Sequence, residues 1–121
     1  MSVTDLTTLV EVEPDHPIIE RPWEYRVIGL DYQIPLDESP PYLDLTLAKG
    51  DSLRRLRFLW PRDLHIERGF PARTGGMQIV DVSARGLEGI RVWVRDIEAS
   101  PGAVEFWAAE VIDLDSPPEV P

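Results

Sequence analysis

The sequence predicts an all-β, single-domain protein: an antiparallel β-sandwich or a small β-barrel of about six to eight strands, with little or no helix. Short runs of alternating apolar and polar residues recur along the chain, and turns rich in glycine or proline separate them. No span longer than ten residues has a 3.6-residue apolar period free of proline and glycine. With 121 residues and no break in composition, the chain fits one domain.

The two ends of the chain differ from its middle. Residues 1–22 are expected to form an irregular arm with a candidate edge strand at residues 8–12, because three prolines follow and proline lacks the N–H that a central strand needs. The all-β domain is expected to span residues 23–114. Residues 115–121 contain three prolines and are expected to form a disordered tail.

The first half of the domain predicts one long strand and one hairpin. Residues 23–34 are rich in aromatic and β-branched side chains, and a change of apolar phase predicts a bulge at Gly29. Residues 42–48 and 52–60 form a hairpin across the turn at 49–51. The expected core positions of this hairpin are Leu43, Leu45, Leu47, Leu56, Phe58 and Trp60.

One position of the hairpin does not fit this alternation. Leu53 is out of phase with Leu56 by one residue, which predicts a bulge near Arg54. Arg55 and Arg57 are expected on the opposite face, pointing away from the core.

The second half predicts shorter strands. Residues 61–76 are the least regular and contain a short strand around Leu64. Further strands are expected at residues 77–83, 89–97 and 103–114, with glycine-containing turns between them.

Composition narrows the classes of function. The formal net charge of −10 argues against binding to nucleic acid or to anionic membranes. The absence of cysteine excludes thiolate chemistry and fits a reducing compartment. Neither a signal-like apolar run nor a membrane-spanning stretch occurs, so a soluble, cytoplasmic protein is expected.

No motif predicts catalysis, a metal or a cofactor. His16 and His65 lie 49 residues apart and in no ligand spacing. There is no Gly-x-Ser-x-Gly, and the 22 carboxylates define no pair. No catalytic residue, metal site or cofactor is therefore assigned, although an enzyme with a scattered carboxylate site stays a third hypothesis.

Positive charge gathers in the middle of the chain. Residues 52–75 carry a net charge of +4, whereas residues 1–51 carry −8 and residues 76–121 carry −6. Four arginines of this segment are candidates for holding a phosphate or another small anion: Arg54, Arg55, Arg57 and Arg62. The alternative is that they pair with the chain's own carboxylates across neighbouring strands.

Residues 81–86 read Asp-Val-Ser-Ala-Arg-Gly, a sequence that resembles the Asp-x-Ser-x-x-Gly element of the PilZ family. Domains of that family are β-barrels that bind cyclic di-GMP, so the resemblance implies a nucleotide receptor with Asp81, Ser83 and Gly86 at the ligand. The family also has two arginines spaced four apart upstream, and this chain has no such pair there. As an alternative, these residues cap a hairpin turn.

The last two predicted strands suggest a contact surface. Trp93 is expected to face outward between Arg91 and Arg95. In residues 103–114, Val104, Phe106 and Ala108 form one face, while Trp107, Ala109 and Val111 form the other. Apolar side chains on both faces of a strand require a second layer, which is either another molecule or another part of this chain.

These patterns support two classes of function. The leading hypothesis is a non-enzymatic protein-interaction, accessory or assembly module that self-associates, with a homodimer as the expected state. Its candidate partner-binding residues are Arg91, Trp93, Arg95, Trp107 and Val111. The alternative is a small anion- or nucleotide-binding β-barrel that uses the central arginines with Asp81, Ser83 and Gly86.

Overall fold

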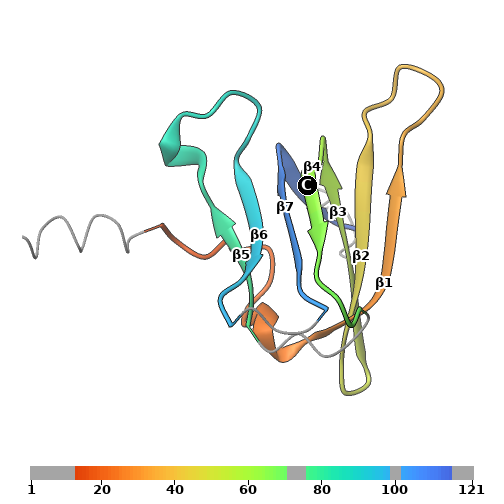
Figure 1. Cartoon of the computed structure of the whole chain (residues 1–121), viewed down its shortest axis with the longest axis vertical. Helices are drawn as coiled ribbons and strands as arrows, with labels where there is room; N and C mark the ends of the chain where they lie inside the picture. Colours follow the sequence, from red (N-terminus) through yellow and green to blue (C-terminus); the bar gives the residue numbers. More distant parts are fainter. Residues whose placement is uncertain (1–12, 71–75, 99–101, 116–121) are drawn as a thin grey trace, which may run out of the picture.

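Eight strands form two four-stranded antiparallel sheets in the computed structural model, which describes residues 13–70, 76–98 and 102–115 (Figure 1). The first sheet has the order β1-β2-β3-β8 and the second has the order β4-β7-β6-β5. The predicted all-β sandwich is confirmed, and the described residues do not close into a barrel. The expected edge strand at residues 8–12 and most of the expected tail lie outside the described ranges.

Most strands lie where the alternation predicts them, but residues 23–25 precede the first strand, and residues 103–114 form two strands rather than one. The strands are β1 (Arg26–Gln33), β2 (Tyr42–Lys49), β3 (Ser52–Leu59), β4 (Arg62–Ile66), β5 (Met77–Asp81), β6 (Val92–Asp96), β7 (Val104–Ala108) and β8 (Glu110–Asp113). The described helical structure consists of two 3-10 turns, η1 (Pro22–Glu24) and η2 (Ser83–Arg85).

The first sheet confirms one predicted bulge and contradicts the other. The register of β1 on β2 shifts between Val27 and Gly29, as predicted. The register of β2 on β3 is continuous from Ser52 to Leu59, so the bulge expected near Arg54 is wrong. Leu53 is out of phase because it points to solvent, where 59% of it is exposed.

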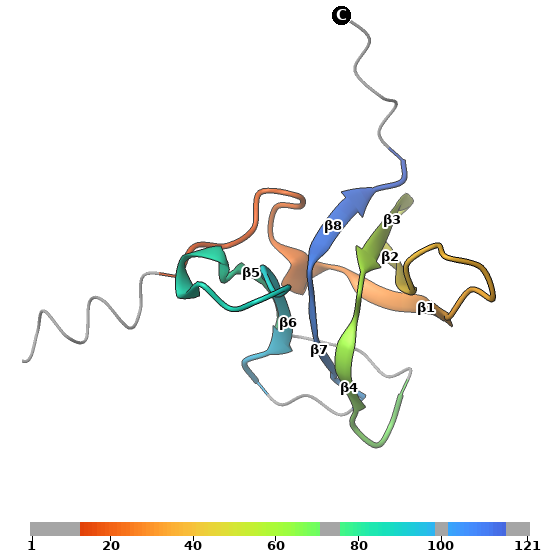
Figure 2. The same ribbon diagram turned by 90° about the horizontal axis from the view of Figure 1, so that it is seen from above.

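The chain bends from one sheet into the other at two corners, one between β3 and β4 and one between β7 and β8. The chain leaves β3 at Trp60, which has a φ of 55°, and continues as β4. It turns again at Ala109, whose N–H donates to the carbonyl of Leu59 at 2.9 Å, so the two corners lie side by side (Figure 2). Strands that switch sheets at a bend are a known way to build such corners.

The corners correct two predictions about the core. Trp60 was expected beside Phe58, but it sits in the bend and is 52% exposed. Residues 103–114 were expected as one strand with two apolar faces, but β7 and β8 belong to different sheets. Val111 therefore lies in the shared core, 8% exposed, and not on the outer face with Trp107.

The core lies between the two sheets. It contains the predicted leucines of the hairpin, all fully buried, and the edge-to-face contact of Phe58 with Phe106, whose ring centroids are 4.9 Å apart. Phe58 belongs to the first sheet and Phe106 to the second, so this contact ties the sheets together.

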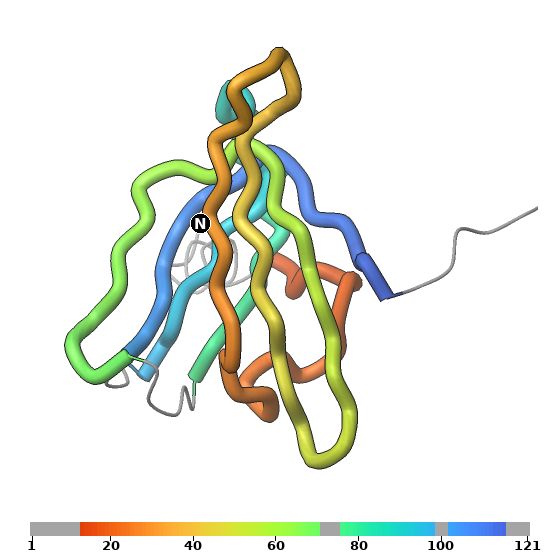
Figure 3. The backbone as a smooth tube through the Cα atoms, turned by 90° about the vertical axis from the view of Figure 1, so that its right-hand side faces the viewer, coloured from red at the N-terminus to blue at the C-terminus, as the bar shows by residue number. Residues whose placement is uncertain are grey.

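The end of the N-terminal arm covers one edge of the second sheet. Asp15 bridges Val80 of β5 in antiparallel fashion. The N–H of His16 donates to Ile79 at 2.8 Å, and the N–H of Asp81 donates to Pro14 at 2.9 Å. The outer edge of β1 in the first sheet, by contrast, has no backbone partner among the described residues (Figure 3).

Candidate functional site

Two tryptophans stack on the outer surface of the second sheet. Trp93 of β6 lies directly opposite Trp107 of β7 in the register. Their ring centroids are 4.5 Å apart and their planes differ by 4°. Because the alternate residues Val94 and Phe106 are buried in the core, the pleat directs both indoles outward, where they are half-buried.

Three arginines surround this pair. The guanidinium of Arg95 lies 4.6 Å from the centre of Trp93, and that of Arg85 lies 5.4 Å from Trp93 and 5.7 Å from Trp107. These distances are within the range of cation–π attraction. Arg62 of β4 lies opposite Trp107 in the register. We call this surface the tryptophan face and define it as Arg62, Arg85, Trp93, Arg95 and Trp107.

Hydrogen bonds to neighbouring side chains fix the positions of Arg95 and Arg85. Arg95 donates through Nε to Gln78 Oε1 at 2.9 Å. Arg85 binds both carboxylate oxygens of Glu13, and this hydrogen bonding lowers the pKa of Glu13. Trp93 Nε1 is buried and has no hydrogen-bond acceptor among the described residues. A buried donor without a partner is uncommon in folded proteins.

The tryptophan face includes only part of the predicted contact set. The structure brings together Trp93, Trp107 and Arg95, as expected. Arg91 instead precedes the first residue of β6 and lines a pocket. Arg85 was assigned only to the turn motif and Arg62 only to the central arginines. No sequence signal places either of them beside Trp107, because that position depends on the pairing of β4 with β7 and on the path of the turn after β5.

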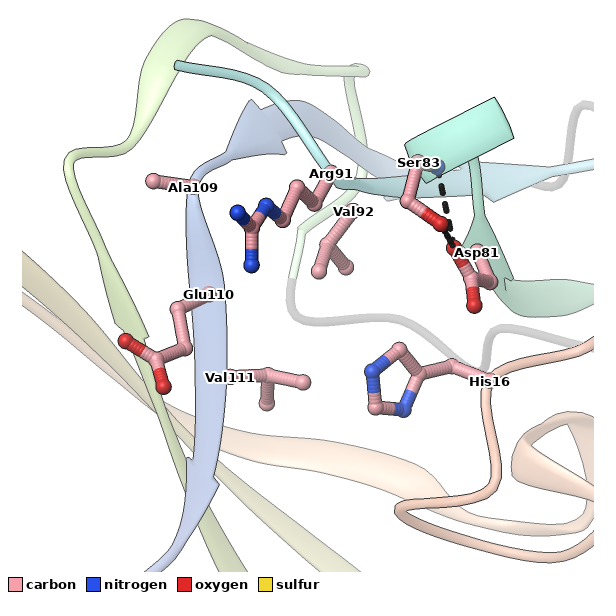
Figure 4. A pocket seen from close by; sticks show the side chains of 8 residues that line it. All are labelled: His16, Asp81, Ser83, Arg91, Val92, Ala109, Glu110 and Val111. Atoms are coloured by element: carbon pink, nitrogen blue, oxygen red, sulfur yellow. Dashed lines mark hydrogen bonds between the residues drawn. The ribbon is translucent and has the colours of Figure 1, made fainter. Parts of the chain in front are cut away.

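A pocket of about 300 Å³ lies between the N-terminal arm, the end of β5 and the start of β8 (Figure 4). The residues that line it are His16, Asp81, Ser83, Arg91, Val92, Ala109, Glu110 and Val111. The pocket thus has polar walls from the arm and the turn, and apolar walls from the strands.

The acidic side of the pocket is an ordinary turn cap. Asp81 Oδ1 accepts hydrogen bonds from Ser83 N–H at 2.9 Å and from Ser83 Oγ at 2.6 Å. These bonds lower the pKa of Asp81, so its carboxylate is charged at neutral pH. Gly86 follows with a φ of 68°, which a side chain would disfavour. The geometry therefore matches the hairpin-cap alternative for residues 81–86.

The other polar residues that line the pocket are His16, Arg91 and Glu110. His16 Nδ1 accepts the N–H of Ile18 at 3.1 Å, and burial lowers the pKa of the imidazole. The guanidinium of Arg91 projects into the pocket and forms no hydrogen bond or ion pair with any described residue (Figure 4). It is close enough to Asp81 to contribute to the lowered pKa of that carboxyl.

The central arginines do not form a common anion site. Arg57 donates twice to Asp44, at 2.9 and 3.0 Å. Arg54 binds Asp113 at 2.7 Å, and Arg55 binds Asp115 at 3.2 Å. Arg62 lies in the other sheet, against Gly89. The geometry of the first three arginines is that of the alternative in which they pair with the chain's own carboxylates.

Within the described ranges, no group of three or more His, Asp or Glu side chains is arranged to hold a metal ion. His65 pairs with Glu67 at 2.8 Å, and His16 lies in the pocket. None of the helical segments in the same ranges has the length and apolar character needed to cross a bilayer.

The fold and its surfaces define a small two-sheet antiparallel β-sandwich with a tryptophan–arginine face and a polar pocket beside the N-terminal arm. Comparison with known proteins adds no relative: no family model, curated protein or solved structure matches the chain.

Proposed function

We propose that this domain is a non-enzymatic accessory or assembly module that works by protein contact, and that the tryptophan face binds its partner. The stacked pair of Trp93 and Trp107 carries this proposal. Tryptophan and arginine are the residue types most enriched at the energetic centres of protein interfaces. Stacked indoles that are already ordered lose little conformational entropy when a partner docks. A cytoplasmic location belongs to the same proposal and fits a chain without cysteine.

The charges of the tryptophan face favour an acidic partner. Arg62, Arg85 and Arg95 belong to this face, and only Arg85 is paired with a described carboxylate, Glu13, on a chain whose formal net charge is −10. A second copy docked face to face would bring these like charges together, which disfavours that arrangement. We therefore assign the tryptophan face to another protein, and we propose that self-association as a dimer uses a different surface.

The test compares what immobilised variants of the full chain retain from a cell extract. We expect wild type to retain a protein that Trp93→Ser/Trp107→Ser and Arg95→Glu lose. Trp23→Ser/Trp60→Ser removes two exposed tryptophans elsewhere and is the matched control. Arg95→Glu keeps both tryptophans, and an unchanged circular dichroism spectrum and melting temperature would show that its loss of binding is not due to unfolding.

The purified partner should then bind wild type and the control in titration calorimetry, and the two face variants at least about tenfold more weakly. Retention of the same proteins by all four baits, or of none by wild type, would overturn the proposal.

A second candidate function is the binding of a small anion, and the pocket supports it better than the central arginines do. Arg91 offers a guanidinium without a hydrogen-bond or ion-pair partner among the described residues, in a pocket that Asp81, Ser83 and Glu110 also line (Figure 4). A PilZ-like receptor for cyclic di-GMP is the narrower form of this candidate, and it would need arginines other than Arg54, Arg55 and Arg57.

A thermal-shift screen tests the second candidate with phosphate, nucleotides, sugar phosphates and cyclic di-GMP at millimolar concentration. A ligand that raises the melting temperature of wild type but not of Arg91→Ala would support it. No shift with any of these compounds would contradict it.

A further inference from the structure

The outer edge of β1 is the longest strand edge that the described residues leave open. Its eight residues pair with β2 on one side only. The other edges are covered or shorter: the arm covers β5, β4 has five residues and β8 has four. Proteins normally block an open edge because its unpaired N–H and C=O groups can pair with another strand. β1 has a bulge near Ile28, but no described segment pairs with its outer edge, and Ile28 is 51% exposed.

Two charged residues of β1, Arg26 and Asp31, form no ion pair with any described residue, although Asp31 adds to the rise in the pKa of Arg57 that its hydrogen bonding to Asp44 mainly causes. Arg26 is exposed and forms no ion pair with any described residue. Asp31 lies directly opposite Asp44 on β2, and like charges in that position repel. The nearest cation, Arg57, directs both of its hydrogen bonds to Asp44. Asp31 is left with one hydrogen bond, from Gln33 Nε2 at 2.7 Å.

The bulge in β1 places these two charges on the same face. In a regular strand, residues five apart point to opposite faces. Because the register shifts between Val27 and Gly29, Arg26 and Asp31 lie opposite Ala48 and Asp44, which are four apart on β2. Arg26 and Asp31 therefore share the outer face, while Val27 and Leu30 share the side that packs on the core.

We infer that a second copy of this chain pairs with the edge of β1, antiparallel and about a two-fold axis, so that Arg26 of each copy lies opposite Asp31 of the other. The same register sets Val27 opposite Leu30 on the core side and Ile28 opposite Gly29 at the centre. Two four-stranded sheets then join into one continuous sheet of eight strands. Each dimer gains two cross-strand ion pairs, since the symmetry repeats every contact.

This inference rests on the proposed self-association but not on the tryptophan face. Trp93 and Trp107 lie on the other sheet, so both tryptophan faces of the dimer stay open to a partner. The two proposals can therefore fail separately.

Charge reversal tests the pairing by sedimentation of the full chain. We expect wild type to be a dimer, and Arg26→Glu and Asp31→Arg each to dimerise at least about tenfold more weakly, because each creates two like-charge pairs. The double variant Arg26→Glu/Asp31→Arg should return to a dimer. So should an equimolar mixture of the two single variants, in which every facing pair is again opposite in sign.

Two further variants control the interpretation. Arg21→Glu reverses an exposed charge outside the strand and should leave the dimer intact. Ile28→Lys adds a charge to the middle of the edge and should give a folded monomer, checked by its circular dichroism and melting temperature.

A wild-type monomer at about 100 μM, single variants that dimerise like wild type, or a double variant without rescue would overturn the inference. Loss of the dimer in Trp93→Ser/Trp107→Ser but not in Arg26→Glu would overturn it while leaving a protein-contact function in place.

Discussion

What an arginine does in this protein depends on which carboxylate the fold brings to it. Arg57 reaches Asp44 across the β2–β3 hairpin, a contact that the hairpin register makes foreseeable from the sequence. Arg54 reaches Asp113, 59 residues away, through the pairing of β3 with β8. Neither Arg26 nor Arg91 forms an ion pair with a described carboxylate. We assign Arg26 to the dimer edge and Arg91 to the pocket.

His16 should make stability depend on pH near neutrality. Burial lowers the pKa of its imidazole in the folded state from 6.5, so the unfolded chain binds the proton more readily. Stability is therefore full above pH 6.5, falls as the pH drops through the lower folded pKa, and stays reduced below it. The free energy of unfolding in urea, measured at about pH 8 and pH 5.5, should fall further for wild type than for His16→Gln. Equal losses would contradict the assignment, since the carboxyl groups titrate at lower pH.

The corner between the sheets is the element that the strand pattern alone does not reveal. From sequence, residues 103–114 look like one strand with apolar side chains on both faces. The chain instead changes sheets at Ala109, and Val111 points into the core. Along β3, the core pattern ends at Phe58 because Trp60 bends the chain into β4. Two-sided apolarity in a strand thus indicates a sheet switch as well as an interface.

Trp60 should be strained at its corner. A positive φ costs a residue with a side chain roughly 1 kcal/mol, and glycine does not incur this cost. Trp60→Ala and Trp60→Gly lose the same half-exposed indole, but only the alanine variant keeps the strain. Urea unfolding should therefore show the glycine variant to be more stable than the alanine variant by about 1 kcal/mol. The reverse order would mean that the corner does not hold this conformation in solution.

The two sheets should unfold together because they share one core. Phe58 and Phe106 meet edge to face across it, and both are fully buried. Phe58→Ala should cost about 3–5 kcal/mol, whereas Leu53→Ala on the same strand, at an exposed position, should change stability by less than about 0.5 kcal/mol.

Tryptophan fluorescence, which includes Trp93 and Trp107 of the second sheet, should report the same transition as far-UV circular dichroism. Separate transitions would show that the two sheets unfold independently, and a similar cost for both variants would contradict the buried position of Phe58.

The sequence by itself determined most of the strands, the hairpin turn at residues 49–51, the bulge at Gly29 and the outward direction of Trp93 and Trp107. These features follow from side-chain alternation and turn chemistry, which act over a few residues. Only the tertiary structure decided the sheet order, the two corners, and which arginines surround the tryptophans or stay without a partner. Those outcomes depend on pairing between strands far apart in the chain, such as β3 with β8 and β4 with β7, and no local pattern encodes that register.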